Sequence, residues 1–353
     1  MIDFPANAHA LIIGVGEYAH SKYADLPATV SDAHAIAGVL TDKDRCGYPQ
    51  ENVRVLVRKD ATSINICEAL KALSQSTKPS STVFIYFSGH GGRLLNGRGS
   101  RSYLCTHETV PDDLIGTAVS GGKFSDMIAA IPAQKVVVML DACHASGLAA
   151  FKSVSGIIPW EVGLQDDYYE ALCQGTGRVI IASSSSDQYS FVREQGDLSL
   201  FTWYLLEALG GKAAVRGDGL IHILDIFHYV SETVRAAKPK QTPILKVKDL
   251  DLNFPVALCH GSKSIASSMA APHVANIREA IVKDAIHGAK LLSDYLKSEP
   301  KLASRGIEVD LKRTELKHIQ RDLELFGQSD NDRVARNRIV FFLLSVCLEL
   351  EET

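Results

Sequence analysis

The sequence lacks paired cysteines, a signal peptide and a long apolar segment. Its seven cysteines are scattered without a CxxC pair, which argues against a zinc site or a disulfide framework and favours a reducing compartment. The N-terminus has no basic start followed by an apolar stretch. The late apolar run at residues 339–350 is shorter than the about 20 residues that span a bilayer. We therefore expect a cytoplasmic protein with no membrane partner.

An excess of basic residues is also missing. The net charge is −4 at pH 7, so the composition gives no reason to expect a nucleic-acid partner. What is present is a globular composition of 353 residues, 46% of them hydrophobic. That length is enough for one large domain and a smaller one.

Short apolar runs alternate with helical patterns over the first 250 residues. We predict strands at residues 9–14, 53–57, 82–87, 136–140 and 179–182. Helical spacing of apolar residues predicts helices at residues 31–40, 62–73, 200–209 and 220–234. Near-continuous apolar strands alternating with helices indicate an α/β fold with a doubly wound, mostly parallel sheet and helices on both faces.

The remaining segments divide the chain into domains. Residues 93–99 and 148–177 carry glycine and serine without a clean period, so we expect loops there. Residues 261–272 are rich in serine and alanine and are the best linker candidate. Beyond them, apolar stripes with a period of 3.6 predict a small helical bundle at 273–353, which leaves 1–260 as the larger domain.

Two segments carry chemistry. Residues 87–92 (FSGHGG) contain His90, and residues 140–147 (LDACHASG) contain Cys143; each follows an apolar strand. The carboxyl ends of parallel strands meet at one edge of a sheet, so we expect the two side chains at the same edge. A thiol with a pKa of about 8.5 needs a base to become a nucleophile, and an imidazole supplies one. No acidic third member is obvious.

The alternative is that Cys143 packs in the core and His90 is an ordinary loop residue. The separation of the two residues and their glycine-rich flanks favour catalysis instead. His144 is a weaker candidate base, because neighbouring side chains on a strand or turn diverge. Backbone amides of Gly91 and Cys143 are candidate donors to an oxyanion.

These motifs resemble the caspase-like cysteine peptidases, and more closely the metacaspase or orthocaspase branch. The resemblance is carried, in family order over residues 9–210, by HALIIGVGEY, the Ser31-Asp32-Ala33 helix start, YFSGHGG, DACHASG, SSSSDQYS and LFTWYLLEAL. It implies a six-stranded caspase-like sheet, a Cys143–His90 pair and a peptidase of the C14 type that needs no cofactor. DACHASG departs from the family pattern by one extra residue before its glycine.

The same branch implies an acidic pocket that selects arginine or lysine before the cleaved bond. The matching positions are Asp32, Ser88 and Asp141, whose carboxylates would bind a cationic side chain. The plainer interpretations are a helix cap for Asp32, a turn residue for Asp141 and a loop hydroxyl for Ser88. Asp187 either shapes the pocket wall or caps a loop.

Regulation is a further expectation. Self-cleavage in residues 148–177 would use Lys152 or Arg178 at the margins of that segment. Calcium is a second possibility, at Asp112–Asp113, but two adjacent acids lack the spacing of a known calcium loop and are usually a solvated turn. No other metal is expected.

The helical residues 273–353 resemble the effector-associated domains of bacterial conflict systems, which implies recruitment to a sensor or adaptor protein; the alternative is a plain stabilising bundle. The leading hypothesis is an Arg/Lys-directed endopeptidase in a regulated bacterial defence or cell-death pathway. Two alternatives stay open: a related peptidase with another preference, and an inactive pseudo-peptidase that acts as an adaptor.

Overall fold

The computed structural model divides the chain into two compact units, Met1–Ser262 and Lys263–Thr353. The structure describes the chain except for residues 1–3, 21–22, 44, 97–98, 143–159, 163, 165, 175–176, 186–187, 194–197, 249–252, 260–276, 278–279, 282, 299–302, 327–334, 337–338, 341, 344–345, 348–349 and 351–353. The predicted linker at 261–272 falls among these residues and stays a prediction.

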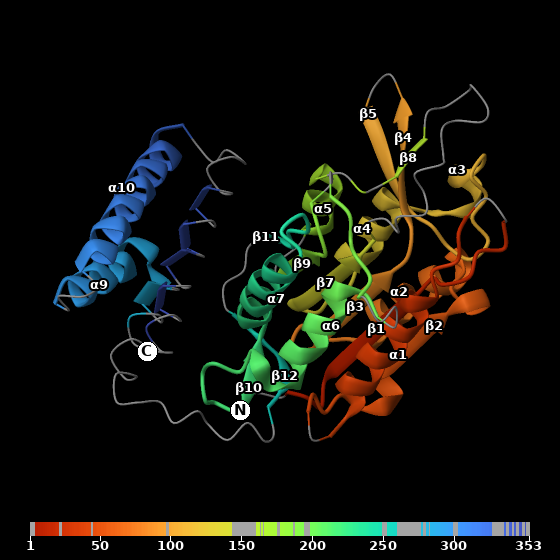
Figure 1. The fold of residues 1–353 in the computed structure, drawn as a ribbon, viewed down its shortest axis with the longest axis horizontal. Helices are drawn as coiled ribbons and strands as arrows, with labels where there is room; N and C mark the ends of the chain where they lie inside the picture. Colours follow the sequence, from red (N-terminus) through yellow and green to blue (C-terminus); the bar gives the residue numbers. More distant parts are fainter. Residues whose placement is uncertain are drawn as a thin grey trace. The chain divides into compact units, whose positions relative to one another are not determined.

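A six-stranded sheet organises the first unit, in the order β11-β9-β7-β3-β1-β2 (Figure 1). All neighbouring pairs are parallel except β11 with β9, which confirms the mostly parallel sheet. Every residue of β3 is buried, as expected for a strand covered on both faces. The strands are β1 (Ala8–Gly14), β2 (Val53–Val57), β3 (Thr82–Ser88), β7 (Lys135–Asp141), β9 (Arg178–Ala182) and β11 (Ile244–Lys248).

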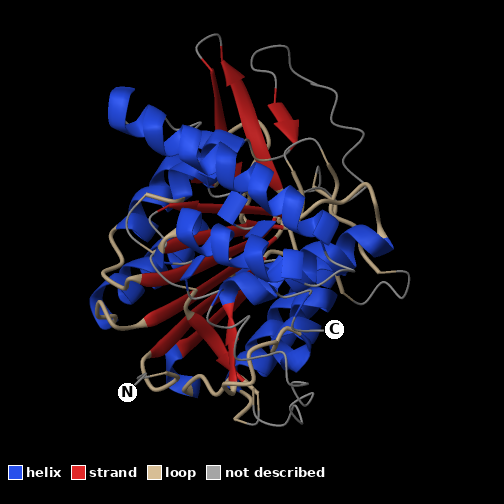
Figure 2. Cartoon of the chain, turned by 90° about the vertical axis from the view of Figure 1, so that its left-hand side faces the viewer, coloured by secondary structure: helices blue, strands red, loops and turns tan. Residues whose placement is uncertain are grey.

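Helices cover both faces of this sheet (Figure 2). One layer contains α1 (Pro27–Thr41), α6 (Leu200–Glu207) and α7 (Ile223–Ala237), which pack side by side. The other layer contains α2 (Ser63–Ser76), α4 (Gly121–Ala129) and α5 (Asp166–Leu172). The predicted α/β architecture is therefore confirmed.

The prediction of a loop at residues 93–99 was wrong. Most of it belongs to a hairpin of β4 (Gly91–Asn96) and β5 (Gly99–Leu104). The hairpin joins β6 (Val119–Ser120) and β8 (Trp160–Val162) in a second sheet. Glycine and asparagine, which are poor strand formers, hide this hairpin in the sequence, and pairing with distant β6 and β8 supplies the missing stability.

The expected loop at residues 148–177 was also only partly right. It contains β8 and α5 among the residues that the structure describes. Arg178, offered above as a cleavage point, is the first residue of β9 and is buried. Its guanidinium donates to the carbonyl oxygens of Ala133 and Ile131. A protease cannot reach this peptide bond without unfolding the strand, so the prediction of cleavage at Arg178 was wrong.

Two helix boundaries differ from the predictions. Helix α1 begins at Pro27, which is suited to the first helical position, and so Asp32 lies in its second turn and is not its cap. The segment predicted as one helix at 220–234 begins with a strand, β10 (Leu220–His222), which pairs with β12 (Pro255–Leu258). Tertiary pairing overrides the local helical pattern there.

The second unit is helical in its described parts. Helices α9 (Ala285–Ser298) and α10 (Ala303–Phe326) pack against each other, and described residues within 277–283 and 335–350 are mostly helical. The apolar positions that predicted the bundle are largely buried: Ile277, Ile281, Ala285, Leu292, Leu296, Leu316, Ile339, Leu343, Val346 and Leu350. Within the described residues, no helix combines the length and the apolar character that a bilayer crossing requires.

Candidate active site

Three neighbouring strands end level with one another in the sheet. Gly14 of β1 pairs with Ser88 of β3, and Ser88 in turn pairs with Asp141 of β7. Beyond the sheet, the Gly89 amide donates to the Asp141 carbonyl oxygen at 3.3 Å. His90 therefore leaves β3 at the carboxyl edge of the sheet, where α/β proteins place their ligands.

The His90 side chain is completely buried and held from several sides. Its backbone amide donates to the Tyr18 hydroxyl at 2.8 Å, and its carbonyl oxygen accepts from the Cys105 amide at 2.9 Å. The rings of Tyr18 and Tyr23 lie against the imidazole, with centroid distances of 4.8 and 5.7 Å. The orientation of the imidazole is thus fixed before any substrate binds.

The carbonyl oxygen of Ala24 lies 3.0 Å from Nε2 of His90. A carbonyl oxygen can only accept, so Nε2 carries the proton and Nδ1 is the basic nitrogen of the neutral ring. This backbone group takes the orienting place that an acid has in a catalytic triad. Sequence reasoning missed it, because a backbone carbonyl leaves no signature in residue types.

Gly91, next to His90, has almost no room for a side chain. A Cβ built on it would lie 2.8 Å from the carbonyl oxygen of Ala142 and 3.1 Å from the Leu164 side chain. The chain after His90 therefore passes directly against the chain after Asp141. Cys143 follows Ala142 and lies outside the described residues, as do Lys152 and Asp187.

The structure brings Asp32, Ser88 and Asp141 together although they lie on three different elements. Their exposed fractions are 0%, 1% and 6%. Oδ2 of Asp32 accepts from the Ser88 hydroxyl at 3.4 Å, and Oδ1 accepts from the Ser199 amide at 2.9 Å. Asp32 is therefore a buried acid in mid-helix, and the helix-cap interpretation is wrong.

Burial and mutual repulsion disfavour the charged forms of these two acids. Desolvation, followed by the charge of Asp141, raises the pKa of Asp32 to about 8. Desolvation likewise raises the pKa of Asp141. Among the described residues, Oδ2 of Asp141 has no hydrogen-bond partner although it is buried. Such a pair is costly by itself and becomes favourable when a cation arrives between the two carboxylates.

Comparison with known proteins places the chain in a family. The family model described as "Caspase domain" matches residues 7–255. The chain belongs to the caspase domain family. Metacaspase-6 of Arabidopsis thaliana is 31% identical over 39% of this chain and 38% of its own length. Metacaspase-1 of Candida glabrata is 27% identical over 53% of this chain and 51% of its own length.

The chain thus matches only a third to a half of the length of these two metacaspases. Among solved structures, caspase-1 from Spodoptera frugiperda is 17% identical, with a TM-score of 0.44 over 70% of this chain and 90% of that chain.

A hydrogen-bond relay supports Asp141 within the caspase domain. The Ser190 hydroxyl donates to Oδ1 of Asp141 at 2.7 Å. Nε2 of the fully buried Gln241 donates to Ser190 Oγ at 3.2 Å and to the Ser183 carbonyl oxygen at 3.1 Å. Ser190 lies in the serine-rich motif that carried the family resemblance, whereas nothing in the sequence singled out Gln241.

Of the two acids considered for calcium, Asp112 and Asp113, the structure gives Asp113 a structural role. The Asp113 side chain caps the short helix α3 (Leu114–Thr117) by accepting from the Gly116 amide at 2.9 Å. Over the part of the chain that the structure describes, no group of three or more histidine, cysteine, aspartate or glutamate side chains could hold a metal ion.

Proposed function

We propose that the caspase domain is a cysteine endopeptidase in which Cys143 is the nucleophile and His90 is the base. Ser88 and Asp141 are paired across β3 and β7, and His90 and Cys143 each follow their strand by two residues. Cys143 directly follows Ala142, and consecutive Cα atoms are about 3.8 Å apart. The carbonyl oxygen of Ala142 lies against Gly91, the residue next to His90. This register is the support for the catalytic pair.

The mechanism follows from the basic nitrogen of His90. Nδ1 takes the thiol proton, and the thiolate attacks the carbonyl carbon of the substrate peptide. The amides of Gly91 and Cys143 stabilise the negative oxygen. The imidazolium then protonates the leaving amine, and water releases the acyl group with His90 again as the base.

We further propose that the residue before the cleaved bond is arginine or lysine. The observation that carries this preference is the pair of buried acids, Asp32 and Asp141, at the same sheet edge as His90. A guanidinium or ammonium group neutralises both carboxylates and can donate to the unpartnered Oδ2 of Asp141. An acidic side chain would add a third negative charge, so cleavage after aspartate is disfavoured.

A fluorogenic peptide panel with Arg, Lys, Asn and Asp at this position tests both parts. We expect turnover of the Arg and Lys peptides only, and loss of all turnover in Cys143→Ala and His90→Ala. Turnover of the Asp peptide would contradict the acidic pocket. Persistent turnover in Cys143→Ala would contradict the nucleophile, and failure of an arginyl chloromethyl ketone to label Cys143 would favour the pseudo-peptidase adaptor.

Asp187 as a pocket wall and Lys152 as a self-cleavage site remain part of the proposal. Incubation of wild type and Cys143→Ala, followed by mass spectrometry, tests self-cleavage; a fragment ending at Lys152 in both would show that another protease makes it.

The helical second unit supports a regulatory role. We propose that residues 273–353 recruit the peptidase to a sensor in a bacterial defence or cell-death pathway. Pull-down with the full chain carrying Cys143→Ala, compared with the same protein truncated after residue 260, tests this role. Equal capture of a partner by both proteins would contradict recruitment through the helices.

A further inference from the structure

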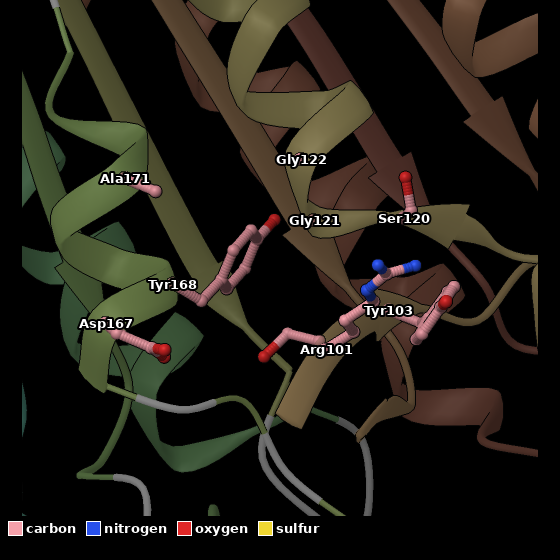
Figure 3. A pocket seen from close by; sticks show the side chains of 9 residues that line it. Arg101, Tyr103, Ser120, Gly121, Gly122, Asp167, Tyr168 and Ala171 are labelled. Carbon is pink, nitrogen blue, oxygen red and sulfur yellow. The ribbon is translucent and has the colours of Figure 1, made fainter. Parts of the chain in front are cut away.

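A cavity of about 350 Å³ lies apart from the acid pair, between the second sheet and two helices (Figure 3). Its walls are β5, the end of β6, the first turn of α4 and one face of α5. The lining residues are Arg101, Ser102, Tyr103, Ser120, Gly121, Gly122, Asp167, Tyr168 and Ala171. This volume is at the lower end of the range for small-molecule sites.

The first turn of α4 offers backbone donors to this cavity. The helix has nine residues, and the amides of its first turn have no intrahelical acceptor. The Ser120 hydroxyl accepts from the Lys123 amide at 3.3 Å, which leaves the amides of Gly121 and Gly122 for another partner. A Cβ on Gly122 would meet nothing within 4 Å, so an anion can approach the backbone closely there.

Two side chains point to the same kind of ligand. Tyr168 is 5% exposed, and its hydroxyl is buried without a hydrogen-bond partner among the described residues. Figure 3 shows this hydroxyl directed toward the first turn of α4, with the Arg101 guanidinium on the other side of the cavity. No described acid forms an ion pair with Arg101, which is exposed. A cation, a helix N-terminus and an unused hydroxyl donor together favour an oxyanion.

We propose that this cavity binds a small phosphate-bearing molecule through Arg101, the first amides of α4 and the Tyr168 hydroxyl. Asp167, which also lines the cavity, repels an anion near it, so the phosphate lies at the α4 end. The aromatic rings of Tyr103 and Tyr168 suit an apolar or aromatic body on the ligand.

The cavity is connected to the candidate active site through one hairpin. Tyr103 of β5 pairs with Gly92 of β4, two residues from His90. The Cys105 amide, just beyond β5, donates to the His90 carbonyl oxygen. A ligand that fixes β5 against α4 therefore also acts on the backbone of His90, which makes this a candidate effector site.

Calorimetric titration of the full chain with inorganic phosphate and phenyl phosphate, at constant ionic strength, tests the binding. We expect phenyl phosphate to bind more tightly than inorganic phosphate, and Arg101→Gln to weaken both about tenfold through the lost charged hydrogen bonds. Arg54→Gln, an exposed arginine outside the cavity, is the matched control and should bind like wild type. Absence of phosphate binding to wild type, or equal weakening in both variants, would overturn the proposal.

Tyr168→Phe separates a ligand-binding hydroxyl from a structural one. Removal of a buried hydroxyl without a partner should raise the melting temperature of the ligand-free protein and weaken phosphate binding in the same variant. A lower melting temperature with unchanged phosphate affinity would mean that the hydroxyl serves the fold, and it would overturn its role in the site. Because binding is measured without peptide turnover, failure here is distinguishable from failure of the proposed peptidase activity.

Discussion

The imidazole Nε2 of His90 donates to the backbone carbonyl of Ala24 across 3.0 Å. This contact takes the orienting place of an acidic third group, which is not obvious in the sequence, and it leaves Nδ1 as the nitrogen that can accept a proton. The backbone of His90 is held separately by Tyr18, whose ring also lies against the imidazole. The position of the proposed base therefore depends on groups that a search for a triad would overlook.

Tyr18→Phe should lower both turnover and stability. The substitution keeps the ring but leaves the buried His90 amide without its acceptor, which costs about 1–3 kcal/mol in the free energy of unfolding. The matched control is Tyr48→Phe, which removes a buried hydroxyl bonded to the Val256 carbonyl oxygen, away from His90. Chemical denaturation and kcat measurements should show a similar stability loss in both variants and reduced kcat only in Tyr18→Phe.

Two glycine-to-alanine substitutions should have opposite effects on stability. At Gly91 the new Cβ would collide with the Ala142 carbonyl oxygen, so we expect destabilisation and loss of turnover. At Gly38, exposed within α1, the Cβ meets nothing, and alanine should stabilise the helix by about 1 kcal/mol. Thermal unfolding of both variants tests this pair; equal melting temperatures would mean that the chain relaxes at Gly91.

The strands of the main sheet could be predicted from sequence because each is a short, near-continuous apolar run. The exception, β11, has alternating lysines on the edge of the sheet and lies antiparallel to β9. The β4–β5 hairpin was missed because its stability comes from partners distant in the chain.

Site residues could be predicted from sequence where the proposed chemistry needs a particular side chain. They could not be predicted where a backbone group makes the contact. His90 and the two acids stood out as residue types at strand ends or in family motifs. Ala24 contributes its carbonyl oxygen, and Gln241 acts on Asp141 through Ser190. Such roles follow from the folded arrangement, and no local pattern encodes them.

Ser190→Ala should weaken the binding of basic substrates. The Ser190 hydroxyl favours the ionised form of Asp141, so its loss should raise the pKa of that acid further and leave less negative charge at neutral pH. We expect KM for an Arg peptide to rise about tenfold, corresponding to one lost charged hydrogen bond, with a smaller change in kcat. Ser190→Thr keeps the hydroxyl and should restore KM.

Ser184→Ala is the control for this prediction, because the Ser184 hydroxyl donates to the Gln188 carbonyl oxygen at 3.2 Å. If kcat fell and KM stayed constant in Ser190→Ala, the relay would act on the chemical step and not on the acidic pocket.

The raised pKa of Asp32, about 8, predicts how substrate binding depends on pH. Below that value the free protein holds a proton on Asp32, and a cationic side chain must displace it in order to bind. KM for an Arg peptide should therefore fall as the pH rises toward 8. In Asp32→Asn, whose amide oxygen can accept from the Ser199 amide and whose NH2 group can donate to the Ser88 hydroxyl oxygen, KM should be higher and should lose this dependence.

The same pKa predicts how stability depends on pH. Rising pH should strengthen substrate binding but lower the free energy of unfolding. Between the ordinary value of 3.8 and about 8, the folded state holds a proton on Asp32 that the unfolded state releases. This group therefore lowers the free energy of unfolding as the pH rises through that window. Asp32→Asn should remove this contribution, whereas Asp126→Asn, on an exposed residue of α4, should unfold like wild type at every pH. Parallel pH profiles for Asp32→Asn and wild type in chemical denaturation would mean that Asp32 is ionised in the folded protein, and the acidic pocket would then need a different electrostatic explanation.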